Sequence, residues 1–123
     1  MTIARAKGDK AKCDDLARQL VRLRQYCQYP GCGTTANLQC CHIVPRGYAR
    51  TRTRLDNLLL LCATHHRLID TFPDEKLMVC QEVYGPGQYL DLRIDAENTR
   101  GQRFDWAAER TRLETLWKKV RPM

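Results

Sequence analysis

One stretch of the chain contains the residues on which the fold depends. It reads Cys27-Gln-Tyr-Pro-Gly-Cys32, then Cys40-Cys41-His42-Ile-Val-Pro45-Arg46, and then Asp56-Asn57-Leu-Leu-Leu-Leu-Cys62-Ala-Thr-His65-His66. Five of the seven cysteines and all three histidines lie within these forty residues. Thiolates and imidazoles at this density are the ligands that a zinc ion selects. The segment therefore predicts a metal-stapled core.

The spacing inside this stretch is that of two metal-binding knuckles. Cys27 and Cys32 flank four residues that include a Pro-Gly turn, and Cys62 and His65 flank two residues. Together they supply the three thiolates and one imidazole of a closed, tetrahedral structural zinc site. The alternative is a set of buried core thiols, and Cys40 is a rival for one of the four positions. A two-Cys, two-His finger does not fit, because no His-x3-His pair follows at the required distance.

The two adjacent histidines point to a second site. On a helix, His65 and His66 would project about 100° apart, so they can hardly serve the same ion. Asp70 follows His66 by four residues and would lie on the same helical face. His66 and Asp70 could therefore share a second site, although Asp70 could equally be a solvated carboxylate at the helix end.

Length and charge narrow the class of protein. The 123 residues predict one domain, and the formal charge is +7, with 21 Lys and Arg against 14 Asp and Glu. A basic balance is typical of a nucleic-acid binder but also fits a solvated surface; 15 of the 21 cations are arginines, which favours phosphate binding. The basic, polar N-terminus predicts no signal peptide, and no run approaches the roughly 20 apolar residues of a membrane span. We expect a cytoplasmic protein that does not enter membranes, with cysteines that act as ligands or buried thiols.

Local patterns predict the other elements. Residues 1–11 read as a flexible basic arm, and residues 46–54 read as a basic loop. The patterns predict helices over 14–26, 63–69 and 89–96, a helix capped by Asp74 that reaches Tyr84, a final helix capped by Asp105, and extended segments over 37–44 and 58–61. The metal core then spans residues 27–70, and residues 72–123 form a helical extension.

The same segment resembles the HNH endonucleases, the treble-clef or ββα-metal nucleases common in phages and bacteria. The resemblance covers about forty residues and rests on the Cys27 and Cys32 pair, on Leu38 to Arg46 with His42, on Asp56 to Cys62, and on His65-His66. It implies an α+β fold in which a two-stranded hairpin and a helix form a small ββα-metal motif. A structural zinc would staple this motif, and further helices would flank it.

The resemblance also implies roles for single residues. His42 falls on the general base, Asn57 on the residue that orients the base or stabilises the loop, and His66 on a ligand of the divalent catalytic ion (Mg²⁺, Mn²⁺, Ni²⁺ or Zn²⁺). Cys41 stands where the family often has a harder ligand, so either it is not a ligand or the ion is a softer one. His65 replaces a cysteine and remains a good zinc ligand. Nucleic-acid phosphates would be held by Arg46, Arg50, Arg52 and Arg54.

The resulting hypothesis is a metal-dependent endonuclease that hydrolyses phosphodiester bonds of double-stranded DNA. The rival hypothesis is a non-catalytic, zinc-stapled DNA-binding or phage DNA-packaging accessory module, which the basic loop and the zinc would serve equally well. A redox-sensing protein built on Cys40-Cys41 is a third. If the protein is encoded by a phage, its setting is the host cytoplasm, and packaging or recombination proteins are possible partners.

Overall fold

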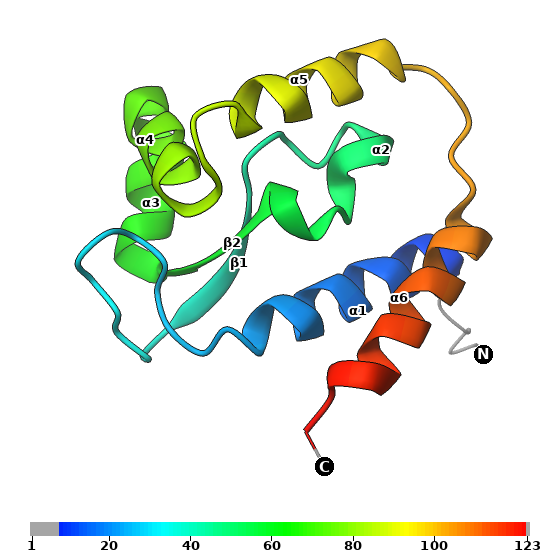
Figure 1. Ribbon diagram of the computed structural model, residues 1–123, viewed down its shortest axis with the longest axis horizontal. Coiled ribbons are helices and arrows are strands. Elements are labelled where there is room, and N and C mark those ends of the chain that lie inside the picture. The colour runs from blue at the N-terminus through cyan, green and yellow to red at the C-terminus, as the bar shows by residue number, and fades with distance from the viewer. Residues whose placement is uncertain (1–7, 123) are drawn as a thin grey trace, which may run out of the picture.

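The computed structural model describes residues 8–122, in which helices surround one small hairpin (Figure 1). Its elements in chain order are α1 (Asp9–Arg22), β1 (Leu38–His42), α2 (Ala49–Arg52), the 3₁₀ turn η1 (Leu55–Asn57), β2 (Leu58–Cys62), α3 (Ala63–Thr71), α4 (Pro73–Tyr84), α5 (Gln88–Asn98) and α6 (Trp106–Val120). The predicted α+β fold, with a hairpin followed directly by a helix, is confirmed.

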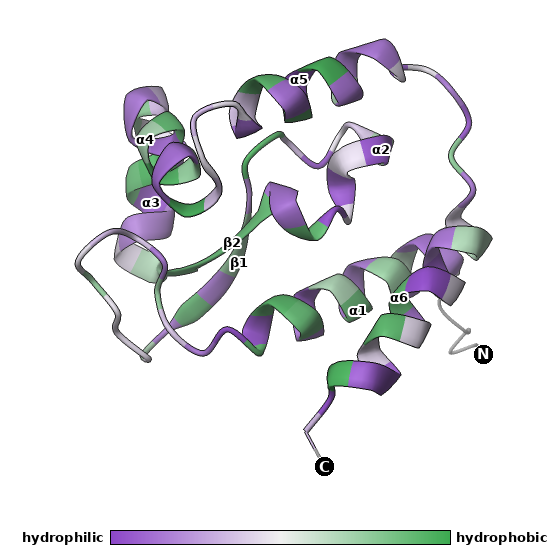
Figure 2. Cartoon of the chain, viewed as in Figure 1, coloured by the Kyte–Doolittle hydropathy of each residue, from purple (hydrophilic) through white to green (hydrophobic). Residues whose placement is uncertain are grey.

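Strand β2 of the hairpin is buried on both faces, which explains its run of four leucines. β1 and β2 are antiparallel, with Leu38 opposite Cys62 and His42 opposite Leu58. Alternate residues of a strand point to opposite faces. Leu58 and Leu60 therefore pack with α1, whereas Leu59 and Leu61 join the core cluster that contains Ile69 of α3. Figure 2 shows the hydrophobic colour running through β2.

The N-terminal and C-terminal helices pack on each other. Cys13 and Leu20 of α1 and Leu113 of α6 form a separate buried cluster, and Trp106 and Trp117 lie against it. In Figure 1, α1 and α6 lie together, away from α3 and α4. The C-terminal extension therefore fixes the position of α1 against the hairpin.

The start of α1 differs from the sequence prediction. The helix begins at Asp9, so residues 9–11 of the predicted basic arm are helical, and residues 1–7 lie outside the described part of the chain. The helix ends at Arg22, and Gln25 follows with a left-handed φ of 74°. Asp9, in the first turn of the helix, pairs with Arg110 of α6 at 3.2 Å.

Two other local predictions are wrong and one is confirmed. Residues 46–54 are not all loop, because they contain the short helix α2. Asp74 is not a cap: Phe72 holds that position and Pro73 begins α4, where a missing N–H costs nothing. Asp105 does cap α6, since its Oδ1 accepts a 3.0 Å hydrogen bond from the Ala108 amide. None of the described helices is both long enough and apolar enough to cross a membrane.

Candidate active site and metal centre

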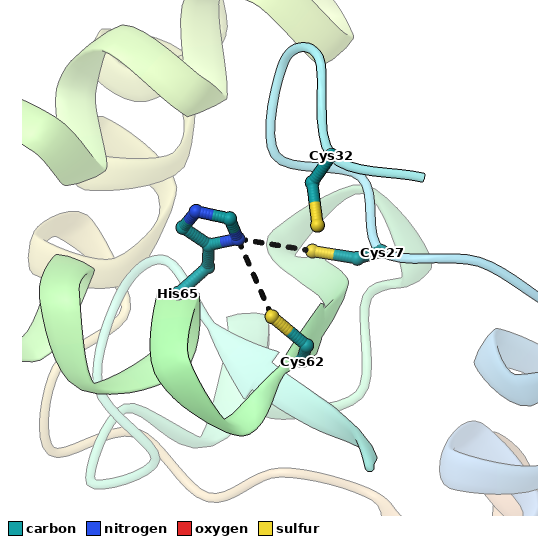
Figure 3. A group of neighbouring side chains, drawn as sticks. All are labelled: Cys27, Cys32, Cys62 and His65. Carbon is teal, nitrogen blue, oxygen red and sulfur yellow. Dashed lines mark hydrogen bonds between the residues drawn. The ribbon is translucent and has the colours of Figure 1, made fainter. Parts of the chain in front are cut away.

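Four side chains converge where the hairpin meets α3 (Figure 3). Cys27 and Cys32 come from the loop before β1, Cys62 ends β2, and His65 lies in the first turn of α3. Their four ligand atoms all lie within 4.8 Å of one another. The Nδ1 atom of His65 is 3.3 Å from the Cys62 sulfur and 3.6 Å from the Cys27 sulfur.

These distances fit a zinc ion. Zinc–sulfur and zinc–nitrogen bonds of about 2.3 and 2.0 Å place the donor atoms of a tetrahedral site roughly 3.5 to 3.8 Å apart. The predicted set of four residues is the set that converges, and it could bind a structural zinc. Cys40 is not part of it, because its side chain packs with the leucines beneath α1. Within residues 8–122, no second group of three or more His, Cys, Asp or Glu side chains converges in this way.

Tyr29 holds His65 in its ligand orientation. The two rings stack with centroids 3.9 Å apart and planes 2° from parallel. The Tyr29 hydroxyl donates a 2.5 Å hydrogen bond to Glu75 of α4. Support of this kind behind a ligand fixes its orientation toward the metal. The sequence gives no sign of this role, because Tyr29 reads only as part of the turn between two cysteines.

His42 ends β1 with one ring nitrogen fixed. Its Nε2 lies 3.1 Å from the main-chain oxygen of Arg52. A carbonyl oxygen only accepts, so Nε2 carries the proton and Nδ1 carries the lone pair. Burial lowers the pKa of His42 below its ordinary value. His42 is therefore neutral near pH 7, with a basic Nδ1 atom.

Asn57 holds together the loop between β1 and β2, which carries the Arg52 carbonyl that contacts His42. We call this role of Asn57 a clamp. The side chain is fully buried. Its Oδ1 accepts a 2.7 Å hydrogen bond from the Val44 amide, and its Nδ2 donates to the carbonyls of Val44 and Thr51 at 3.1 and 3.0 Å. The polar atoms of Asn57 are thus used within the protein. These contacts favour the loop-stabilising role that the resemblance implied for Asn57, and a catalytic role stays a prediction.

We predict that Asn57→Ala destabilises the protein. The change leaves three buried main-chain groups without their partner, and a buried unsatisfied polar group costs about 1–3 kcal/mol. Because the loop can relax, the expected loss is about 2–4 kcal/mol in the free energy of unfolding, measured by urea denaturation of the zinc-loaded protein. Asn98→Ala, at an exposed position of α5, is the matched control. Equal stability of the two variants would contradict the clamp.

His66 lies between two oxygen atoms. Its Nδ1 is 2.6 Å from Oε1 of Gln39, and its Nε2 is 3.2 Å from Oδ2 of Asp70. The juxtaposition of His66 with Asp70 agrees with the helical spacing. Gln39 was missed, although the period-2 pattern of β1 places it on the same strand face as Cys41. Gln39 and Asp70 contact different nitrogens of the ring, so an ion on one nitrogen would have only one of these two oxygens beside it.

Cys41 lies on the same face of β1 as Gln39 but is buried in the core. Its side chain is 1 % exposed, lies in the core cluster with Leu59 and Leu61, and contacts the Gln39 carbonyl. Burial raises the pKa of this thiol far above its usual range. Both facts argue against the open prediction that Cys41 binds the catalytic ion.

The four predicted phosphate-binding arginines differ in their availability. Arg52 is bidentate to Asp14, with bonds of 2.9 and 2.8 Å. Arg54 is held by three carboxylates, those of Asp56, Asp91 and Asp95. Both side chains are thus held by carboxylates of the protein, and their contact with nucleic-acid phosphates stays a prediction. The remaining two side chains are more exposed: Arg46 (63 %), with its nearest carboxylate 3.9 Å away, and Arg50 (54 %), with its nearest 3.7 Å away.

One cleft connects the histidines. It has a volume of about 500 Å³ and is lined by both His42 and His66. Its walls include Asp14, Arg18 and Arg22 of α1 on one side and Asp70 of α3 on the other. β1 pairs only with β2, so its other edge is unpaired within the described hairpin and faces this space. The cleft thus brings together His42 and His66, which are 24 positions apart in the sequence.

The hairpin, the helix after it and the Cys3His cluster define a ββα-metal motif. Residues 27–72 match the family model described as HNH endonuclease, so this segment of the chain is similar to an HNH endonuclease domain. The match covers somewhat more than a third of the chain and leaves α1, α4, α5 and α6 outside. Searches of curated proteins and of solved structures found no significant match.

Proposed function

We propose that the protein is a metal-dependent endonuclease that hydrolyses phosphodiester bonds of double-stranded DNA. The observation that carries the proposal is the shared cleft, which His42 and His66 both line. The similarity of residues 27–72 to the HNH endonucleases implies a nucleic-acid substrate. The net charge of +7 favours a polyanion.

In this proposal His42 is the general base. Its Nδ1 takes a proton from a water molecule whose oxygen attacks the phosphorus. The new bond joins this oxygen to phosphorus, and the bond to the 3′ oxygen breaks, which leaves a 5′-phosphate and, once the leaving oxygen is protonated by solvent, a 3′-hydroxyl. The Arg52 carbonyl that accepts from Nε2 stabilises the positive charge that His42 acquires.

His66 is the residue that would hold the divalent ion through Nε2, with the Asp70 carboxylate beside that nitrogen and Gln39 at the opposite nitrogen of the ring. Such an ion, when bound, supplies charge stabilisation to the phosphate and the leaving oxygen. This donor set leaves room for substrate and water, as Mg²⁺ sites commonly do. The zinc at Cys27, Cys32, Cys62 and His65 would have only a structural part.

A second function is favoured by one observation. The side chain before His42 is Cys41, which is buried in the core, so the cleft lacks the ligand that the family often places there. This favours the non-catalytic DNA-binding or DNA-packaging accessory module. Such a module would not require a neutral His42 in the same cleft as His66, and the arrangement of these two residues favours the nuclease.

The test is the nicking of supercoiled plasmid by zinc-loaded protein with no added ion, or with Mg²⁺, Mn²⁺, Ni²⁺ or Zn²⁺. We expect ion-dependent nicking that His66→Ala lowers by about 100-fold or more, because the ion loses its imidazole ligand. Arg67→Ala, on the same helix but outside the cleft, is the matched control and keeps the wild-type rate. Salt-sensitive DNA binding without cleavage by any ion would replace the nuclease with the accessory module.

A further inference from the structure

The wall of the cleft that α1 forms carries a row of charged side chains. Asp14, Arg18 and Arg22 are spaced four residues apart, so they share one face of the helix, and all three line the cleft. Asp14 marks the end of the row nearest His42, because it binds Arg52, whose carbonyl holds the His42 ring. A rise of 1.5 Å per residue places Arg18 about 6 Å and Arg22 about 12 Å from Asp14 along the helix axis.

Arg18 and Arg22 are available, as is Arg46, whereas two other arginines near the cleft are held within the protein. Arg24 is occupied by the carbonyls of Leu55 and Leu58, and Arg52 by Asp14. Arg18 is about half exposed, and its ion pair with Asp15 is an exposed i,i+3 contact, which contributes little to stability and exchanges readily. Arg22 is exposed, and within residues 8–122 it has no ion-pair partner.

The charge of the whole cleft matches a polyanion. Its lining includes the cations Arg18, Arg22, Arg46, Arg52 and Lys76, against the carboxylates of Asp14 and Asp70 only. Both carboxylates already have partners, in Arg52 and His66. Low-dielectric walls lined by one sign of charge concentrate the field in the cleft. Guanidinium groups in a row suit the repeating phosphates of a nucleic-acid backbone.

We propose that α1 is a backbone-binding helix, in which Arg18 and Arg22 each hold one phosphate of the DNA strand on one side of the cleavage position. The proposal rests on the proposed function in taking DNA as the ligand. α1 lies outside residues 27–72, so this contact is an addition of this chain to the HNH segment. The two arginines position the strand and do not read its sequence.

The test is the salt dependence of binding to a fluorescein-labelled 20-base-pair duplex, measured by anisotropy on zinc-loaded full chain without added divalent ion. Each phosphate contact contributes about 0.9 to the slope of log K against log salt. Arg18→Gln with Arg22→Gln should therefore reduce the slope by about 1.8 and weaken binding by about tenfold or more near 0.1 M salt. Arg18→Lys with Arg22→Lys keeps both charges and should keep most of the slope.

The matched control is Lys118→Gln with Lys119→Gln, which removes the same charge from exposed positions of α6 away from the cleft. Zinc content and circular dichroism establish that each variant is folded. An unchanged slope in the arginine variant, or an equal fall in the lysine control, overturns the proposal. The nicking assay of the wild-type protein tests the nuclease separately. If the protein does not nick DNA but the arginine variant lowers the salt slope, the contact of α1 with DNA is supported and the nuclease is rejected. If the protein nicks DNA but the arginine variant leaves the slope unchanged, the nuclease is supported and the contact of α1 is rejected.

Discussion

Replacement of His42 by alanine is expected to lower the rate of plasmid nicking by about 10²- to 10⁴-fold, the usual contribution of a positioned general base. The side chain supplies a neutral imidazole whose Nε2 proton is held by the Arg52 carbonyl, which leaves Nδ1 to accept a proton. Alanine removes this acceptor. The measurement is the single-turnover nicking rate with saturating protein, so that weaker binding does not enter the result.

The control is to show that the His42→Ala protein still folds, binds zinc and binds DNA. His42 is not among the four residues of the metal cluster, and alanine at a partly buried strand end should leave the hairpin paired. We expect one zinc per chain, and a salt slope of DNA binding equal to that of the wild type. A His42→Ala protein that nicks as fast as the wild type would reject His42 as the base.

The largest effect on stability is expected from Cys62→Ala. Cys62 ends β2 and begins α3, so it joins both elements to the loop that carries Cys27 and Cys32. Structural zinc contributes an apparent 10–16 kcal/mol of binding free energy in small zinc domains, roughly as much as the total stability of a typical domain, about 5–15 kcal/mol. Loss of one of four ligands should therefore lower zinc occupancy and unfold much of the region around the hairpin.

The matched control is Cys40→Ser, because Cys40 is half-buried on the strand paired with β2 and does not belong to the cluster. Zinc per chain is measured by atomic absorption, and unfolding by circular dichroism with heating. We expect one zinc in the wild type and in Cys40→Ser, and a strong loss of zinc and of the cooperative transition in Cys62→Ala. Full zinc occupancy in Cys62→Ala, or zinc loss in Cys40→Ser, would contradict the ligand set.

Much of the metal centre and hairpin could be predicted from local patterns alone. Cys62 and His65 are three residues apart, so a strand end followed by a helix turn brings them together almost independently of the rest of the chain. The run Leu58 to Leu61 predicts an extended segment, and in the structure it forms the buried strand β2. The same local geometry explains why His66 meets Asp70.

The partners of the arginines could not be predicted in this way. Arg52 reads as a free cation in a basic segment, but its carboxylate comes from Asp14, 38 positions earlier. Arg54 is bound by Asp95, 41 positions later. Whether a basic side chain meets DNA or an internal acid depends on how distant helices pack, and a periodic pattern carries no information about that.

Local patterns were enough to predict the two strands, the helix after them and the ligand spacing within each pair of the metal cluster, because each of these depends on residues a few positions apart. Only the tertiary structure decided that Asn57 is a buried clamp, that Cys41 faces the core, and that α1 forms a wall of the cleft. The physical reason is that burial and ion pairing depend on contacts between distant segments, here set by the packing of α6 on α1 and of α1 on the hairpin.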